Sequence, residues 1–139
     1  VGKRVEEYEL LLKQNNIQYT YECDLSNEEI IKKYEQADII ALVSTYQGFG
    51  MPILEAQAIG RPVITSNILS MPEVAGNGAC LVNPDDITEI RKGILKIIQD
   101  DAYRAELINA GVKNCKRFDP EIIANQYMKL YEIITQSVR

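Results

Sequence analysis

The stretch that decides the fold is STYQGFGMPILEA, residues 44–56, which puts a glycine-containing turn between two apolar elements. The residues Asp38 to Ser44 are almost continuously apolar, which predicts a central strand covered on both faces in a parallel sheet. The residues after the turn predict a helix from Met51 to Ile59, and Pro62 to Thr65 predict the next strand. This order of elements indicates a βαβ unit.

The same alternation extends over the rest of the chain. Further strands are expected at Ile17–Cys23 and Ala79–Val82, where β-favouring residues gather. Because strands alternate with helices, the expected fold class is α/β, a Rossmann-like parallel sheet flanked by helices. About four strands are expected where a complete doubly wound domain has five or six, so residues 1–139 predict one domain that starts part-way through its fold. Further helices are expected at Arg4–Asn15, after the Ser26–Glu29 capping box, at Met71–Ala75, after the cap Asp86, at Ala102–Lys116 and from Asp119 to Thr135.

Composition excludes several classes of function. The net charge of −5, without a continuous basic face, argues against nucleic-acid binding. There is no histidine, the commonest general base and metal ligand. Cys23, Cys80 and Cys115 are too widely spaced for a zinc ribbon and are interpreted as reduced, buried thiols. The apolar runs are too short to cross a bilayer and no signal-like segment opens the chain, which predicts a cytoplasmic location, with any membrane association carried upstream of Val1.

The glycine turn is the candidate binding site. Gly48 and Gly50 let the backbone turn sharply, and the amides at the start of the next helix lie at the positive end of its dipole, where a diphosphate fits. Glu55 lies about one helical turn further on, so its carboxylate is expected to accept hydrogen bonds from sugar or ribose hydroxyls. Gln47 is expected to touch the same ligand.

Several motifs support one family. The segment at residues 44–56 resembles the signature of family-four retaining glycosyltransferases of GT-B fold, E-G-F-G-[LM]-P-x-x-E-A. In that family the signature is followed by G-x-P-V-I and then by P-E-V. The sequence holds GRPVI at residues 60–64 and PEV at 72–74, in that order. The pair AD at 37–38 and the stretch VNPDD at 82–86 resemble two further motifs of the family, so the similarity covers nearly the whole chain.

The resemblance implies the C-terminal, donor-binding half of an enzyme that transfers a sugar with retention from a UDP- or GDP-sugar. The acceptor, a glycan or a lipid-linked sugar, is then held by an N-terminal domain upstream of Val1, so this chain alone is expected to transfer little. No D-x-D triplet occurs, so neither a metal nor another cofactor is expected. The expected donor contacts are Gly48, Phe49, Gly50, Met51, Pro52, Glu55, Ser66 and Asn67.

The family faces the donor with two glutamates separated by seven residues. The second resembles Glu55, whereas the first falls at Gln47, so both positions are catalytic candidates. Gln47 can hydrogen-bond a sugar hydroxyl, but it cannot stabilise a cationic transition state by negative charge.

Less specific interpretations stand beside these. Glu55 can be an ordinary surface carboxylate, the ring of Phe49 is expected to pack under the loop, and Ser70 is expected to cap the helix that follows it. A flavodoxin-like interaction module, or a GT-B sugar-nucleotide epimerase, is the alternative function.

Overall fold

The structure is a computed structural model that describes residues 6–137, and the chain divides into two compact units, residues 1–33 and 34–139. The first unit contains α1 (Glu6–Gln14) and most of α2 (Asn27–Gln36). The capping box is confirmed, since Ser26 Oγ accepts from the Glu29 amide at 3.3 Å and Glu29 Oε2 accepts from the Ser26 amide at 2.8 Å. The predicted start of the first helix at Arg4 lies outside the described residues.

The strand predicted at Ile17–Cys23 is wrong. These residues form no strand in the structure, and Ile17 and Tyr21 are 52% and 45% exposed. High β propensity reflects a side chain that fits a pleated, half-buried surface, and this segment pairs with no strand among residues 6–137. Cys23 is consequently exposed and Cys115 is half-buried, so the buried-thiol interpretation holds only for Cys80.

The second unit contains the sheet, which is parallel and three-stranded in the described residues, with the order β1 (Ile40–Leu42), β2 (Val63–Ser66), β3 (Ala79–Val82). The predicted α/β class is therefore confirmed, but the central position predicted for the strand at Asp38–Ser44 is wrong. Among the described strands β1 lies at the edge, and β2 is the strand whose residues are all buried. The helices of this unit are α3 (Met51–Ala58), α4 (Met71–Ala75), α5 (Ile87–Gln99), α6 (Asp101–Cys115), the short 3-10 helix η1 (Lys116–Phe118) and α7 (Pro120–Ser137).

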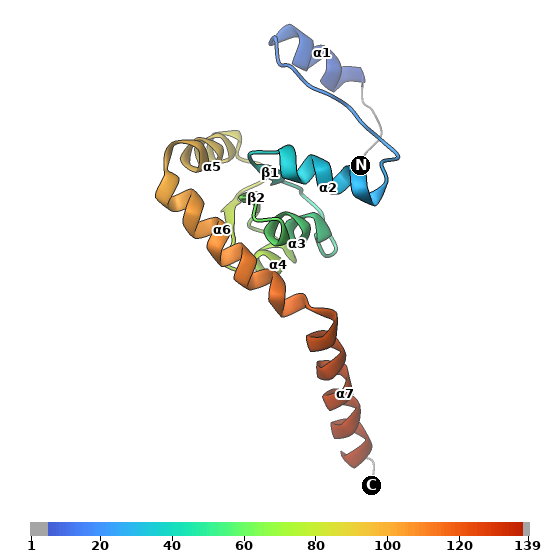
Figure 1. Cartoon of the computed structure of the whole chain (residues 1–139). Coiled ribbons are helices and arrows are strands. Elements are labelled where there is room, and N and C mark those ends of the chain that lie inside the picture. The colour runs from blue at the N-terminus through green and yellow to red at the C-terminus, as the bar shows by residue number, and fades with distance from the viewer. Residues whose placement is uncertain (1–5, 138–139) are drawn as a thin grey trace. The chain divides into compact units, whose positions relative to one another are not determined.

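Helices cover both faces of the sheet (Figure 1). Because side chains alternate along a strand, Val63 packs with α3 and α4, whereas Ile64 packs with α5 and α6. Each face has its own apolar cluster, one around Ile53 and Met71 and the other around Ile97. The two clusters fix the three layers that position the ends of the strands.

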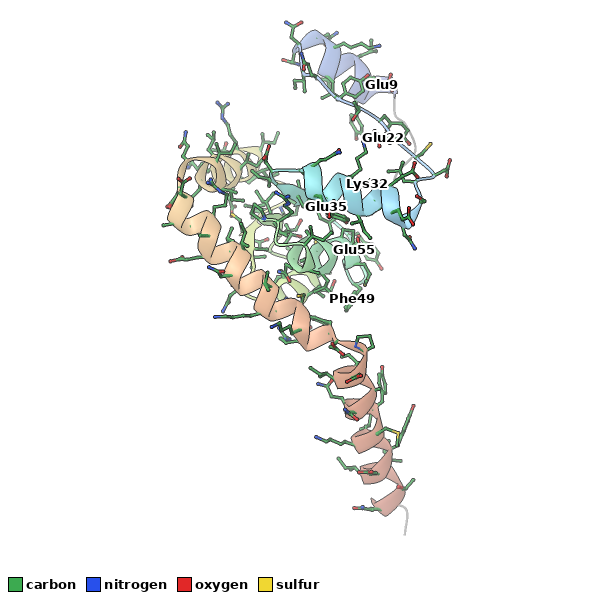
Figure 2. The ribbon with its side chains drawn as sticks, viewed as in Figure 1. Glu9, Glu22, Lys32, Glu35, Phe49 and Glu55 are labelled. Atoms are coloured by element: carbon green, nitrogen blue, oxygen red, sulfur yellow. The ribbon has the colours of Figure 1, made fainter. Side chains whose placement is uncertain are left out.

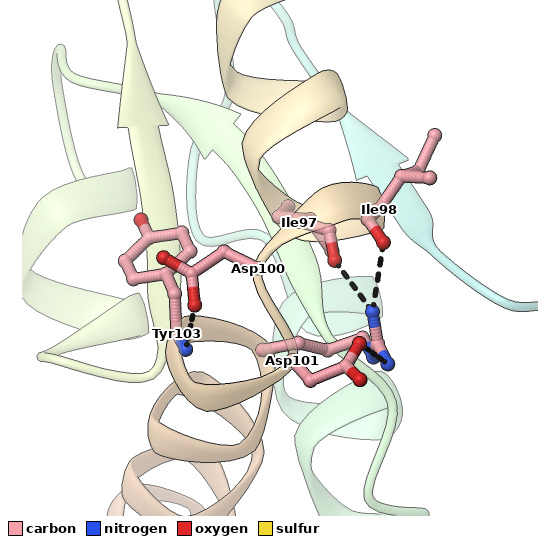
Figure 3. Close-up of polar contacts among 6 residues, drawn as sticks. Ile97, Ile98, Asp100, Asp101 and Tyr103 are labelled. Carbon is pink, nitrogen blue, oxygen red and sulfur yellow. Dashed lines mark hydrogen bonds and ion pairs between the residues drawn. The ribbon is translucent and has the colours of Figure 1, made fainter.

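The corner between α5 and α6 is held by polar contacts (Figure 3). Asp100 Oδ1 accepts from the Tyr103 amide at 2.9 Å, which caps α6, as Asp86 caps α5. Arg104 donates to the carbonyls of Ile97 and Ile98 at the end of α5. In contrast, α7 exposes most of its large apolar side chains, namely Ile122, Tyr127, Met128, Leu130, Tyr131, Ile133 and Ile134.

Buried polar side chains join α3, α4 and α6. Gln57 donates to the Ala75 carbonyl at 2.9 Å, and Asn114 donates to Gln57 Oε1 at 2.8 Å and to the Val74 carbonyl at 2.7 Å. Gln57 is 1% exposed and Asn114 is 7% exposed, so these bonds satisfy groups that water does not reach. They fix the end of α4 relative to α3.

We expect Gly78→Ala to lower the free energy of unfolding by about 3 kcal/mol, the upper end of the range for an overpacked core. An added Cβ at Gly78 would lie 2.4 Å from Gly111 Cα and 2.6 Å from Gln57 Nε2, so the α6 backbone and the buried amide must both move. Urea denaturation measures the change. The control is Asn77→Ala at the exposed neighbouring position, and equal stabilities of the two variants would contradict the expectation.

Candidate functional site

The loop between β1 and α3 is shaped by its glycines. Gly50 has φ +96°, a left-handed conformation, and an added Cβ would lie 3.1 Å from Ile53 Cδ1, so this position requires glycine. Nothing lies within 4 Å of a Cβ added to Gly48, which faces open space. Before the turn, Ser44 Oγ donates to the Tyr46 carbonyl at 2.7 Å and accepts from its amide.

The first turn of α3 is open to an anion. Gly50 is the N-cap residue and no side chain caps this helix, while Pro52 has no amide hydrogen. The Ile53 amide is already bonded to the Gly50 carbonyl at 2.9 Å. The amides of Gly48 to Met51 lie at the positive end of the helix dipole, an environment that favours a negatively charged ligand.

Hydroxyl groups from β2 and from the start of α4 bind carbonyls of β1 and the loop. Thr65 Oγ1 donates to the Leu42 carbonyl at 2.9 Å, and Ser66 Oγ donates to the Ser44 carbonyl at 2.7 Å. Ser70 Oγ lies 3.0 Å from the Gln47 carbonyl oxygen and 3.5 Å from that of Phe49. The Ser66–Ser44 bond continues the attachment of the chain to β2 beyond Leu42, the last paired residue of β1, and the Ser70 bond attaches the loop to the start of α4.

The capping role predicted for Ser70 is wrong. Ser70 occupies the N-cap position of α4, but its hydroxyl makes no cap bond. The hydroxyl instead donates to the loop, because the Gln47 carbonyl lies within hydrogen-bond distance.

Glu55 points from α3 and carries a hydrogen bond that the sequence did not predict (Figure 2). The Tyr34 hydroxyl, on α2, donates to Glu55 Oε2 at 2.7 Å, and both residues are half-buried. A carboxylate accepts several hydrogen bonds, so this contact orients Glu55 and leaves capacity for a ligand hydroxyl. Burial, and second the hydrogen bond to Glu55, raise the pKa of Tyr34 above its ordinary value.

The other predicted contacts differ in their exposure to solvent. Phe49, labelled in Figure 2, is 43% exposed, and its ring lies edge to face with the Phe118 ring, with 5.7 Å between the ring centroids. Ser66 is fully buried, so its side chain serves the sheet, whereas Asn67 is exposed just beyond β2. Gln47 is half-buried.

Sequence reasoning missed two hydrogen bonds: the one from Tyr34 to Glu55, and the one from the Ser70 hydroxyl to the Gln47 carbonyl, the Ser70 tether. Both bonds join residues that are far apart in the sequence, and the sequence alone does not show where a side-chain hydroxyl ends in the folded chain. Across residues 6–137 there is no group of three or more His, Cys, Asp or Glu side chains arranged to hold a metal ion. No described helix is long and apolar enough to cross a membrane.

Comparison with known proteins decides the family, because the family described as glycosyl transferases group 1 matches residues 2–114. The chain belongs to the group 1 glycosyltransferases. O-antigen chain mannosyltransferase B of Escherichia coli is 35% identical over 108 residues, which are 78% of this chain and 28% of the relative. This assignment does not favour an interaction module or an epimerase.

Solved structures of the same fold agree. Sucrose-phosphate synthase from Thermosynechococcus elongatus matches with a TM-score of 0.80 and 26% identity over 95% of this chain and 34% of that chain. Anabaena Alr3699/HepE, solved with UDP and glucose, matches with a TM-score of 0.77 and 23% identity over 91% of this chain and 36% of that chain. The sheet and its helices are thus the GT-B Rossmann-like domain that the resemblance implied, and this group 1 chain spans about a third of these proteins.

We expect Tyr34→Phe to weaken the loss of stability at alkaline pH. The folded-state pKa of Tyr34 is raised, so its contribution is fully present below about pH 10, where the unfolded residue is also neutral, and is lost as the pH rises above that value. Burial raises the pKa of Tyr103 as well, so the slope of the unfolding free energy against pH should become smaller in Tyr34→Phe but not reach zero. Urea denaturation between about pH 9 and 11 measures this slope. The control Tyr46→Phe, at an 81% exposed position, should keep the wild-type slope, and identical slopes for both variants would count against the Tyr34 assignment.

Proposed function

We propose that this chain is the donor-binding half of a retaining glycosyltransferase that moves a sugar from a UDP- or GDP-sugar to a glycan or lipid-linked acceptor. A further, N-terminal domain holds the acceptor. The family match supports sugar transfer, and the Anabaena relative, solved with UDP, supports a nucleoside diphosphate as the leaving group. The reaction takes place in the cytoplasm, with any membrane attachment carried by the other part of the enzyme.

The observation that carries the proposal is the uncapped start of α3, with Glu55 one turn further along the same helix. The amides of Gly48 to Met51 bind the diphosphate, because they are donors at the positive end of a dipole. Glu55 binds the ribose diol, since a carboxylate accepts from hydroxyls and repels phosphate. The charges therefore separate the two parts of the donor.

Gln47 and Asn67 complete the donor contacts. The amide of Gln47 binds a hydroxyl of the transferred sugar and supplies no negative charge to the transition state. Asn67 lies exposed just beyond β2 and reaches the sugar or the nucleotide. Pro52 fixes the backbone of the first turn of α3 and has no amide hydrogen to donate. The ring of Phe49 supports the loop through its contact with the Phe118 ring. Ser66 contributes through its bond to the Ser44 carbonyl.

We expect Glu55→Gln to weaken nucleoside diphosphate binding about tenfold, as the loss of hydrogen bonds to a charged group does. Calorimetric titration with UDP and with GDP measures the affinity and identifies which nucleotide base the site prefers. The control is Glu106→Gln, a substitution of the same chemistry at an exposed position on α6, which should bind as the wild type does.

The titration is repeated on the full-length enzyme, together with product analysis. Saturable binding that depends on Glu55, with transfer to an added acceptor, supports the proposal. The absence of nucleotide binding by the full-length protein would overturn it, and the release of free sugar and nucleotide without transfer would indicate an epimerase.

A further inference from the structure

The Ser70 hydroxyl contacts the loop at peptide units that carry the proposed phosphate donors. Its oxygen lies 3.0 Å from the carbonyl oxygen of Gln47 and 3.5 Å from that of Phe49. The amide hydrogens of these same peptide units belong to Gly48 and Gly50. A serine hydroxyl has one hydrogen to donate, and the shorter distance assigns its hydrogen bond to the Gln47 carbonyl, in the peptide unit that places the Gly48 amide.

Peptide geometry turns this contact into a constraint on direction. In a planar trans peptide the C=O and N–H bonds point in opposite directions, so a carbonyl held toward Ser70 aims the following amide away from it. A flipped peptide would present a carbonyl oxygen, which repels an anion. Glycine tolerates such flips because it has no side chain to restrict its backbone angles, and Gly48 follows the Gln47 carbonyl directly.

The backbone of Ser70 is itself held in place by its neighbours. The Val74 amide donates to the Ser70 carbonyl at 2.9 Å, and the neighbouring Met71 is fully buried. Leu69, immediately before Ser70, has φ +56°, a conformation that costs a leucine energy and persists where the surroundings impose it. The chain thus accepts local strain at the residue that leads into the tether.

We propose that Ser70 is a positioning residue for donor binding: its hydroxyl holds the Gln47–Gly48 peptide in the orientation that directs the Gly48 amide to the diphosphate. This inference rests on the proposed function of the loop. In this role Ser70 acts through the loop backbone and not by contact with the nucleotide sugar.

The first experiment compares the wild type with Ser70→Ala and Ser70→Thr by ¹⁵N NMR of the free chain. The Gly48 amide signal should shift and its order parameter should fall in Ser70→Ala, whereas both should return to the wild-type values in Ser70→Thr, which keeps the hydroxyl. An unchanged Gly48 signal in Ser70→Ala would overturn the proposal without reference to any ligand.

The second experiment measures which part of the ligand senses the tether. Ser70→Ala should bind the preferred diphosphate, UDP or GDP, about fivefold more weakly, the effect of one neutral hydrogen bond, and should bind the corresponding nucleoside as the wild type does. Chemical-shift titration gives both affinities, and Ser70→Thr should recover the wild-type values. An equal loss for nucleoside and diphosphate would indicate a purely structural role and overturn the inference.

Failure of the inference and failure of the proposed function are distinguishable. A wild-type full-length protein that binds neither UDP nor GDP would overturn the function of the loop and the role of Ser70 with it. A wild type that binds UDP or GDP while Ser70→Ala loses no affinity would overturn the role of Ser70 alone.

Discussion

Hydrogen bonds from hydroxyl side chains of Thr65, Ser66 and Ser70 to main-chain carbonyls hold the loop on which the rest of the site depends. The parallel ladder between β1 and β2 ends with Leu42 opposite Thr65. Beyond that point a chain rich in glycine has no regular partner. The hydroxyls provide one, so the order of the sheet extends into the turn without a longer strand.

That attachment is only as rigid as the element that carries it. The buried amides of Gln57 and Asn114 bind the last carbonyls of α4, while the hydroxyl before its first residue reaches the loop. The short helix is therefore held at both ends by polar contacts and in its middle by apolar burial. The close approach of Gly78 to Gly111 makes room for the amides, which links the packing of α6 to the geometry of a distant loop.

The sequence was informative wherever periodicity and glycine placement decide the backbone. The strand–turn–helix order around residues 44–56, the caps at Asp86 and Ser26 and the α/β class all follow from local rules, and the structure contains them. Strand identity at Ile17–Cys23 and the central place given to β1 failed, because both depend on partners that a single segment does not reveal.

The side-chain contacts of the site were beyond such rules. A serine before a helix is expected to cap that helix, whereas the Ser70 hydroxyl bonds to the Gln47 carbonyl, a partner 23 positions earlier that comes within reach only in the folded chain. The bond from Tyr34 to Glu55 has the same origin, since it joins two helices that are separate in sequence.

Holding a loop by its carbonyls separates its shape from its side chains. Tyr46 is 81% exposed and Phe49 is 43% exposed, and none of the hydroxyl bonds involves either ring. Substitution of the exposed Tyr46 side chain therefore leaves these backbone hydrogen bonds in place, so the loop can change its surface chemistry and keep its main-chain geometry. Under the proposed function, such a change would alter contacts with the transferred sugar and spare the amides that the diphosphate requires.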